Sequence, residues 1–227
     1  MTGDEVRAFI SYAHEDRTVA AQAKRSLENV GVSAFLAHED LQISEEWEAR
    51  IRVELAGCDV FVALLSKHSR SSSWASQEAG FIASRLAEVV VLPLSLDGTR
   101  TEGFLRHLQS PSIDQRTGSQ VLVEPIAGRF PRTVLPKLIK EAVAAGSFDR
   151  ASELLARLSR FFPLMTADEA QAFAEGAAKN TQVWLATKCQ REYLPKFMQI
   201  QGANINPETA RALRYQIEHD QWYRPES

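Results

Sequence analysis

Two uninterrupted apolar segments constrain the fold more than any other feature of this 227-residue sequence. Residues 59–65 read Asp-Val-Phe-Val-Ala-Leu-Leu, and residues 89–94 read Val-Val-Val-Leu-Pro-Leu. Both segments lack the alternation of a half-exposed strand, which predicts strands that are buried on both faces. Strands of that kind belong to parallel sheets covered by helices on each side. The chain is therefore predicted to contain an α/β domain.

Strand and helix patterns alternate through the first 146 residues. Further strands are predicted over residues 6–11, 32–36 and 121–123. Helices are predicted over residues 17–30, from 44 past 55, over 74–87 and over 134–144. Asp16 is positioned to cap the first helix with its side chain, and Gly31 suits the exit of that helix. The alternation predicts a five-stranded, flavodoxin-like parallel sheet over residues 1–146.

The remaining residues, 147–227, carry helical patterns throughout. Pro163 ends a first amphipathic helix, and Thr166 with Glu169 forms a capping box for the next. This second helix is predicted over residues 170–189, with Gly176 as a weak point. Asn206 and Pro207 begin a last helix as its cap and first residue. A small all-helical domain is therefore predicted. Its aromatic residues form either its core or a surface for a partner protein or self-assembly; they are Trp184, Tyr193, Phe197, Trp222 and Tyr223.

Composition excludes several functional classes. The formal net charge of -3 argues against a nucleic-acid-binding protein, which usually carries a basic excess. No apolar run approaches the roughly 18 residues of a membrane span, and the acidic N-terminus is unlike a secretory signal. The two cysteines, Cys58 and Cys189, lie too far apart for a disulfide framework or a zinc knuckle. We expect a cytoplasmic protein.

Ligands of open parallel sheets bind beyond the carboxyl ends of the strands. Polar and aromatic residues gather just after the first three long strands, at Ser11, Tyr12 and His14, at 38–41, and at 66–68 and 71–74. The three histidines of these segments, His14, His38 and His68, come from separate loops without the short spacing of metal ligands. No metal or cofactor is therefore expected, and the carboxyl edge of the sheet is the predicted site.

One pair of residues suggests a particular chemistry. Trp74 and Glu78 lie four residues apart on a predicted helix, so both side chains share one face. An indole can stack on a ring, while a carboxylate binds ribose hydroxyls or stabilises positive charge at an anomeric carbon. From its spacing alone, the short pattern favours the plainer interpretation of a tryptophan that packs in the core and a solvated glutamate.

Three blocks of sequence, in order, resemble the TIR (Toll/interleukin receptor) domain family. Residues 9–16, Phe-Ile-Ser-Tyr-Ala-His-Glu-Asp, are similar to the family's first strand and loop. Residues 35–41 with Glu46 and Trp47 resemble the second strand and BB loop of bacterial members. Residues 62–66, then 73–78, resemble the third strand and the helix with the family's Ser-x-Trp-Cys-x-x-Glu motif. The resemblance is strong to about residue 100 and looser to about 146, and it implies the same flavodoxin-like sheet.

The resemblance also implies a function. Many bacterial TIR domains cleave the nicotinamide–ribose bond of NAD as hydrolases or cyclases, often in antiviral defence, with NAD as substrate and no cofactor. The family's essential glutamate corresponds to Glu78, and its motif tryptophan, which flanks the nucleotide, to Trp74. Ser11, Tyr12 and His14 match loop positions that line the cleft. Asp40, Leu41 and Trp47 match the BB loop, where an aromatic residue often packs on the ligand. A second TIR copy often completes the site.

The sequence departs from the family pattern at two places, and two alternatives stay open. Ala75 replaces the motif cysteine, and Ile43-Ser44 stands where the BB loop usually has a glycine. Other TIR domains are non-enzymatic adaptors that act by association, through the BB loop and here also the C-terminal helices. A different nucleoside-processing enzyme on the same fold is the third interpretation. The retained glutamate favours NAD cleavage, because this reaction needs a carboxylate and no thiol.

Overall fold

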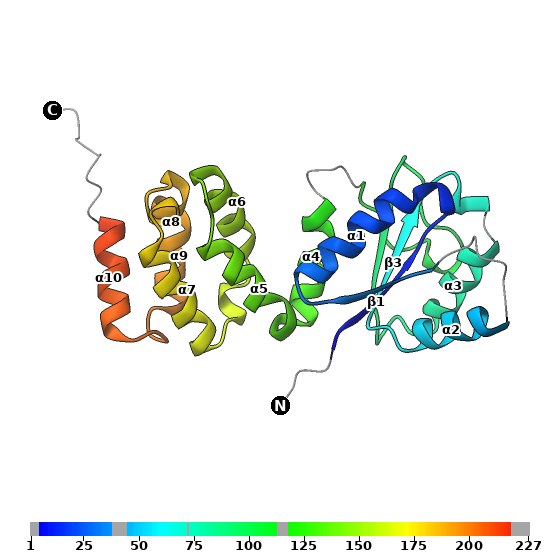
Figure 1. Ribbon diagram of the computed structural model, residues 1–227, viewed down its shortest axis with the longest axis horizontal. Helices are drawn as coiled ribbons and strands as arrows, with labels where there is room; N and C mark the ends of the chain where they lie inside the picture. Colours follow the sequence, from blue (N-terminus) through cyan, green and yellow to red (C-terminus); the bar gives the residue numbers. More distant parts are fainter. Residues whose placement is uncertain (1–4, 38–44, 72, 113–117, 219–227) are drawn as a thin grey trace. The chain divides into compact units, whose positions relative to one another are not determined.

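The computed structural model describes residues 5–37, 45–71, 73–112 and 118–218 (Figure 1). The chain forms two compact units, Met1–Val134 and Leu135–Ser227. The division falls inside helix α5 (Pro131–Val143), whereas the sequence analysis placed it after that helix, at about residue 146.

The first unit is built on a parallel sheet, as the two apolar segments predict. Its strands are β1 (Arg7–Ser11), β2 (Ser33–Leu36), β3 (Val60–Leu65) and β4 (Val90–Ser95), in the order β2-β1-β3-β4. Phe9 of β1 pairs with Phe35 on one side and Phe61 on the other. The register places all carboxyl ends at one edge, so the segments that follow the strands gather there.

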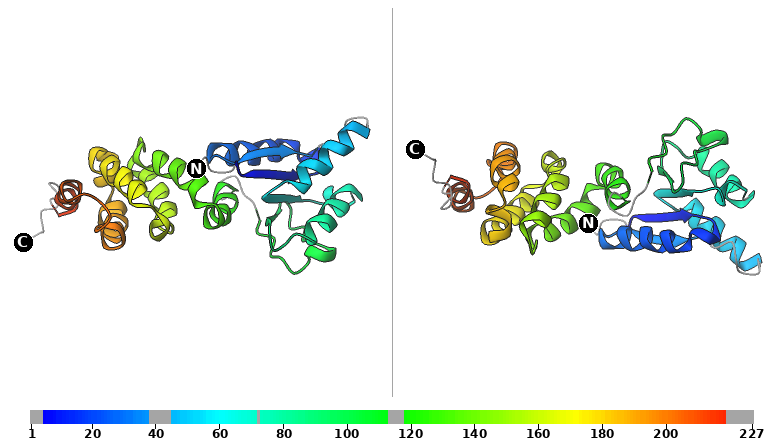
Figure 2. Two further views of the ribbon diagram at one scale, coloured as in Figure 1. Left: turned by 90° about the horizontal axis from the view of Figure 1, so that it is seen from below. Right: turned by 90° about the horizontal axis from the view of Figure 1, so that it is seen from above.

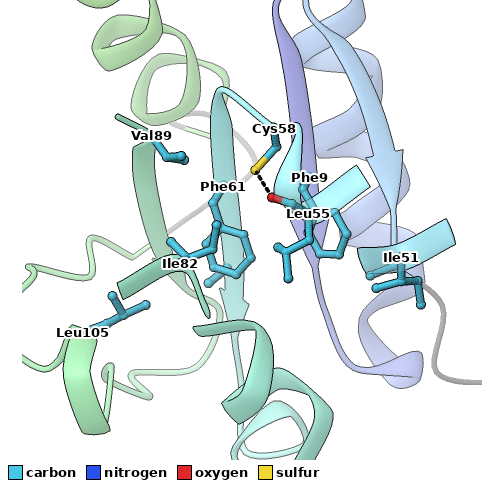
Figure 3. Packing of buried hydrophobic residues seen from close by; sticks show 10 residues of the cluster. Phe9, Ile51, Leu55, Cys58, Phe61, Ile82, Val89 and Leu105 are labelled. Atoms are coloured by element: carbon cyan, nitrogen blue, oxygen red, sulfur yellow. Dashed lines mark hydrogen bonds between the residues drawn. The ribbon is translucent and has the colours of Figure 1, made fainter. Parts of the chain in front are cut away.

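Helices cover both faces of this sheet, and α1 and α3 lie on opposite sides of it (Figure 2). The helices are α1 (Arg17–Asn29), α2 (Glu45–Ala56), α3 (Ser73–Ala83) and α4 (Gly118–Arg129). Phe9 and Phe61 pack with Ile51 and Leu55 of α2 and Ile82 of α3 in one buried cluster (Figure 3). The flanking residues Ala8 and Ile10 of β1 are buried as well. Burial of consecutive residues requires cover on both faces, which explains the unbroken apolar strands.

The predicted fifth strand is wrong for the described part of the chain, because Val121–Val123 lies inside α4. Leu122, Val123, Ile126 and Ala127 are buried, while Gly128 is exposed. Buried residues at spacings of three to four positions mark one face of a helix. A three-residue apolar run does not carry enough positions to distinguish this pattern from a strand.

Asp16 does not cap α1 with its side chain, contrary to the sequence-based expectation. Its Oδ2 instead accepts a hydrogen bond of 2.6 Å from the Ser66 hydroxyl, fifty positions along the chain. The carboxylate thus connects the segment after β1 to the segment after β3. Gly31 does adopt the positive φ, 85°, predicted for the exit of α1.

The second unit contains only helices among its described residues, as predicted. They are the last part of α5, α6 (Phe148–Leu158), a 3₁₀ turn η4 (Phe162–Leu164), α7 (Ala167–Lys179), α8 (Thr181–Trp184), a π-helical turn (Cys189–Tyr193), α9 (Leu194–Gln201) and α10 (Pro207–Glu218). The aromatic rings of Phe162, Phe173 and Phe197 contact one another at its centre, with centroids 4.6–5.6 Å apart. The capping box of Thr166 and Glu169 is confirmed, and Asn206 accepts a bond from the Thr209 amide.

The helix predicted over residues 170–189 is broken at Asn180. The Asn180 side-chain amide donates to the carbonyls of Val143 and Ala145 at 2.9 and 3.0 Å, and its Oδ1 accepts from the Gln182 amide. One asparagine therefore ends α7, caps α8 and satisfies carbonyls at the end of α5. Such side-chain bonds to the backbone compete with the helix, and helical periodicity alone does not reveal them. No helix in the described ranges is long and apolar enough to cross a membrane.

Replacing Gly176 tests the contact between α7 and α5. A Cβ atom at this position would lie 2.6 Å from the Val143 Cβ. Gly176→Ala is therefore expected to lower the free energy of unfolding by about 1–3 kcal/mol through overpacking. Gly128→Ala, at an exposed helical glycine with open space, should raise it by up to about 1 kcal/mol. Denaturant titrations compare the two, and a stabilising Gly176→Ala would contradict the close approach.

Candidate functional site

The best-defined polar contact of the first unit joins Glu78 to Ser11. Glu78, on α3, is 3% exposed, and Ser11, the last residue of β1, is 5% exposed. The Ser11 hydroxyl donates a hydrogen bond to Oε2 of Glu78. Burial of a carboxylate is costly unless hydrogen bonds replace its water shell. Glu78 is thus a buried, held carboxylate, which excludes the interpretation of a solvated helix glutamate.

Two further predicted residues lie beside this pair on the segment that follows β1. Tyr12 is buried, and His14 is half-buried in a 3₁₀ turn, η1 (His14–Asp16). Nε2 of His14 lies 3.4 Å from the Arg17 guanidinium. The first predicted group, Ser11, Tyr12 and His14, is therefore assembled at the carboxyl end of β1, with Glu78 reaching it from α3.

A hydrogen-bond network fixes the segments at this edge relative to one another. The buried Ser66, just after β3, donates to Asp16 and accepts from the amides of His68 and Ser69, each at 3.2 Å. His68 also lies 3.6 Å from the Glu15 carboxylate. Two loops that belong to neighbouring strands are thereby joined before any ligand binds, which is the preorganisation a binding site needs.

The other predicted site residues fall outside what the structure describes. Asp40 and Leu41 lie outside the described residues. Trp47 and Trp74 have described backbones in α2 and α3, but their side chains are outside the described part. Their roles as ring-holding residues stay predictions. The helical spacing of Trp74 and Glu78, four positions apart on α3, is confirmed for the backbone.

A cavity of about 370 Å³ opens between α3 and the segment after β4. Ser11 lies on its wall, whereas Glu78 is not one of its lining residues. Sequence reasoning missed the residues of its outer side, which include Arg70, Glu102 and Phe104. The rule that ligands bind beyond the carboxyl ends of strands would have found most of them, had it also been applied to the end of the fourth strand.

The two cysteines carry none of this chemistry. Burial raises the pKa of the Cys58 thiol to about 11, and the nearby Arg85 opposes this without reversing it. Burial likewise raises the pKa of Cys189 to about 11. A thiol with such a pKa is protonated at neutral pH and is a poor nucleophile. The described residues also contain no group of three or more acidic, histidine or cysteine side chains suited to a metal.

Comparison with known proteins assigns the first unit to a family. The sequence profile of the TIR domain matches residues 8–122, just over half of the chain, from β1 into α4. The matched region contains Ser11, Glu78 and the network around Ser66, and it stops before the second unit. No curated protein shows significant similarity to the chain.

Removing the hydroxyl of Ser11 tests whether the contact with Glu78 holds the unit together. Ser11→Ala takes a donor from a buried carboxylate and should lower the free energy of unfolding by about 1–3 kcal/mol. Ser84→Ala is the matched control, because the exposed Ser84 hydroxyl donates a hydrogen bond to the carbonyl of Phe81. This substitution should change the free energy of unfolding by less than about 0.5 kcal/mol. If both substitutions lower the free energy of unfolding equally in denaturant titrations, the buried hydrogen bond contributes no more to stability than the exposed one.

Proposed function

The chain belongs to the TIR domain family, and we propose that it cleaves the nicotinamide–ribose bond of NAD with Glu78 as its catalytic residue. The observation that carries this proposal is the buried Glu78 carboxylate, held by Ser11 at the carboxyl edge of the parallel sheet. A carboxylate fixed in a site of low polarity stabilises developing positive charge far better than a solvated one. This is the requirement of glycosidic cleavage.

In the proposed reaction, the bond between the nicotinamide nitrogen and the anomeric carbon of ribose breaks. The bonding electron pair leaves with nicotinamide, which departs as a neutral molecule, and the ribose becomes oxocarbenium-like. Glu78 binds the ribose hydroxyls and stabilises that charge. Attack by water then gives ADP-ribose and a proton, while attack by another part of the ligand gives a cyclic product.

The other predicted residues serve to position the substrate in this proposal. Ser11 orients the carboxylate, and Tyr12 and His14 lie on the same segment at the site. Trp74 and Trp47 would hold the rings of NAD, and Asp40 and Leu41 would contribute the BB loop. No cofactor or metal takes part, because the positive charge on the nicotinamide ring of NAD already makes it a good leaving group. The setting we propose is defence signalling in the bacterial cytoplasm.

Comparing Glu78→Gln with the unaltered chain tests the proposal. The amide keeps the shape of the side chain but removes its negative charge, so nicotinamide release should fall about 10²–10³-fold. Release is followed by chromatography after incubation of concentrated protein with NAD. Glu88→Gln, the same chemical change at a side chain that is 71% exposed, should leave the rate unchanged.

Three outcomes would contradict the proposal. Equal release by the unaltered chain and by Glu78→Gln would remove the role given to Glu78. Absence of release at every protein concentration, with correct folding verified by circular dichroism, would favour a non-enzymatic adaptor. Turnover of other glycosides in place of NAD would indicate a different nucleoside-processing enzyme.

Self-association forms part of the proposal, since TIR domains commonly associate. Two large apolar side chains are exposed on the α2 and α3 layer: Val53 is 67% and Phe81 is 43% exposed. Exposed apolar surface of this kind supports association between copies. The second unit exposes Phe148, Leu164 and Tyr215, which supports the predicted surface for a partner protein on its helices.

The rate of nicotinamide release per molecule is therefore expected to rise with protein concentration. Val53→Glu should flatten this dependence by opposing association, whereas Phe148→Glu, on the second unit, should not. Serial dilution over about a hundredfold range, with the mass measured in parallel by light scattering, provides the data. A rate per molecule that stays constant over this range would contradict the need for a second copy.

A further inference from the structure

The 370 Å³ cavity lies on a different flank of α3 from the catalytic carboxylate. Ser76, Ala79 and Gly80 of α3 line it, whereas Glu78 does not. On a helix, residue 78 points away from the direction shared by residues 76, 79 and 80. The volume lies within the roughly 300–1,000 Å³ of small-molecule sites. The cavity is therefore large enough for a ligand of its own.

The inner part of the cavity is apolar and open. Phe61, Ala63 and Leu65 of β3 form one side, and Leu105 of the 3₁₀ turn η3 (Gly103–Leu105) forms another. Figure 3 shows Leu105 at the edge of the buried cluster and Phe61 between Ile82 and Phe9. A Cβ atom at Gly80 would meet nothing within 4 Å, so the α3 side has room for a flat ring. Such an interior favours an aromatic group, and Phe104, 78% exposed, lies on the outer lining.

The rim carries more positive than negative charge. A shallow hollow that shares Arg70, Arg100 and Glu102 with the cavity is also lined by Lys67 and Asp97. Arg70 pairs with Glu102 at 2.6 Å. Hydrogen bonds from Thr99 and from the Lys67 amide, together with the charge of Lys67, lower the pKa of Asp97 and keep its carboxylate ionised. Three cations thus face two carboxylates, and Arg100 is the cation for which the described residues show no ion pair.

The segment after β4 holds this arrangement in place without a ligand. The Leu96 amide donates to the Leu65 carbonyl at 2.8 Å, and the Gly98 amide donates to the Ser95 hydroxyl at 2.9 Å. The Lys67 amide donates to Asp97 at 2.8 Å, which joins the segments after β3 and β4. A rim fixed by backbone bonds loses little freedom when an anion binds.

We propose that this cavity binds a nucleoside monophosphate, at a site separate from Glu78. The base lies against the apolar wall of Phe61, Ala79 and Leu105, and the phosphate lies at the rim beside Lys67 and Arg100. The apolar interior selects the ring, and the surplus of cations selects the phosphate. Because Ser11 lines this cavity and also bonds to Glu78, the occupant touches the residue that orients the catalytic carboxylate.

Calorimetric titration of the full chain with adenosine monophosphate, in the absence of NAD, tests the proposal independently of any cleavage. Adenosine, which lacks the phosphate, and ribose 5-phosphate, which lacks the base, should each bind at least about tenfold more weakly. Gly80→Leu fills the cavity and should weaken binding of the monophosphate at least about tenfold, and Arg100→Gln, at an exposed position, should weaken it by a similar factor. Gly128→Leu, at an exposed helical glycine of α4, should have no effect.

Three results would overturn the proposal. The first is no binding of the monophosphate up to about 1 mM. The second is binding that Gly80→Leu and Arg100→Gln both leave unchanged, which would place the nucleotide elsewhere. The third is equal affinity for adenosine and its monophosphate, which would remove the role of the cationic rim. Since Arg100 lies on the surface, its variant remains informative even if Gly80→Leu fails to fold.

Discussion

Burial of the Glu78 carboxylate is the constraint on which the candidate site of the first unit depends. Glu78 is almost inaccessible to solvent, and the Ser11 hydroxyl at the end of β1 donates a hydrogen bond to it. A buried charge without such a donor would cost several kcal/mol. The bond can form only because β1 ends beside β3 and the chain after β3 folds back as α3. The parallel sheet is thus the frame that brings two residues, 67 positions apart in the sequence, into contact.

Acidic side chains also join the segments that follow the strands at the carboxyl edge of the sheet. Asp16 was expected to cap a helix, yet it serves to join the segments after β1 and β3 through Ser66. Asp97 joins the segments after β3 and β4 in the same manner through the Lys67 amide. Acidic side chains that look like ordinary loop residues therefore determine the geometry of the edge. This continuity connects the carboxylate of the proposed NAD reaction with the cavity proposed to hold a nucleotide.

The sequence predicts the parallel sheet, because consecutive apolar residues such as Phe61 and Val62 need cover on both faces. It also identifies Glu78 and Ser11, through the edge rule and the resemblance to TIR domains. The strand predicted at Val121–Val123 is wrong because three residues are too few to show a periodicity. The break at Asn180 was not predicted because it depends on hydrogen bonds from this side chain to distant backbone carbonyls. Glu102 and Phe104 were missed because the edge rule was applied only to the first three strands, and the approach of η3 to α3 is what brings them to a cavity.

The central claim is that Glu78 binds the ribose of NAD and stabilises charge at its anomeric carbon. The most direct test is a crystal structure of the protein with a carbocyclic NAD analogue, in which a methylene group replaces the ribose ring oxygen and prevents cleavage. Ribose hydroxyls are expected within about 3 Å of the Glu78 carboxylate oxygens. An analogue bound with its ribose out of reach of Glu78, at a concentration that saturates the protein, would contradict it.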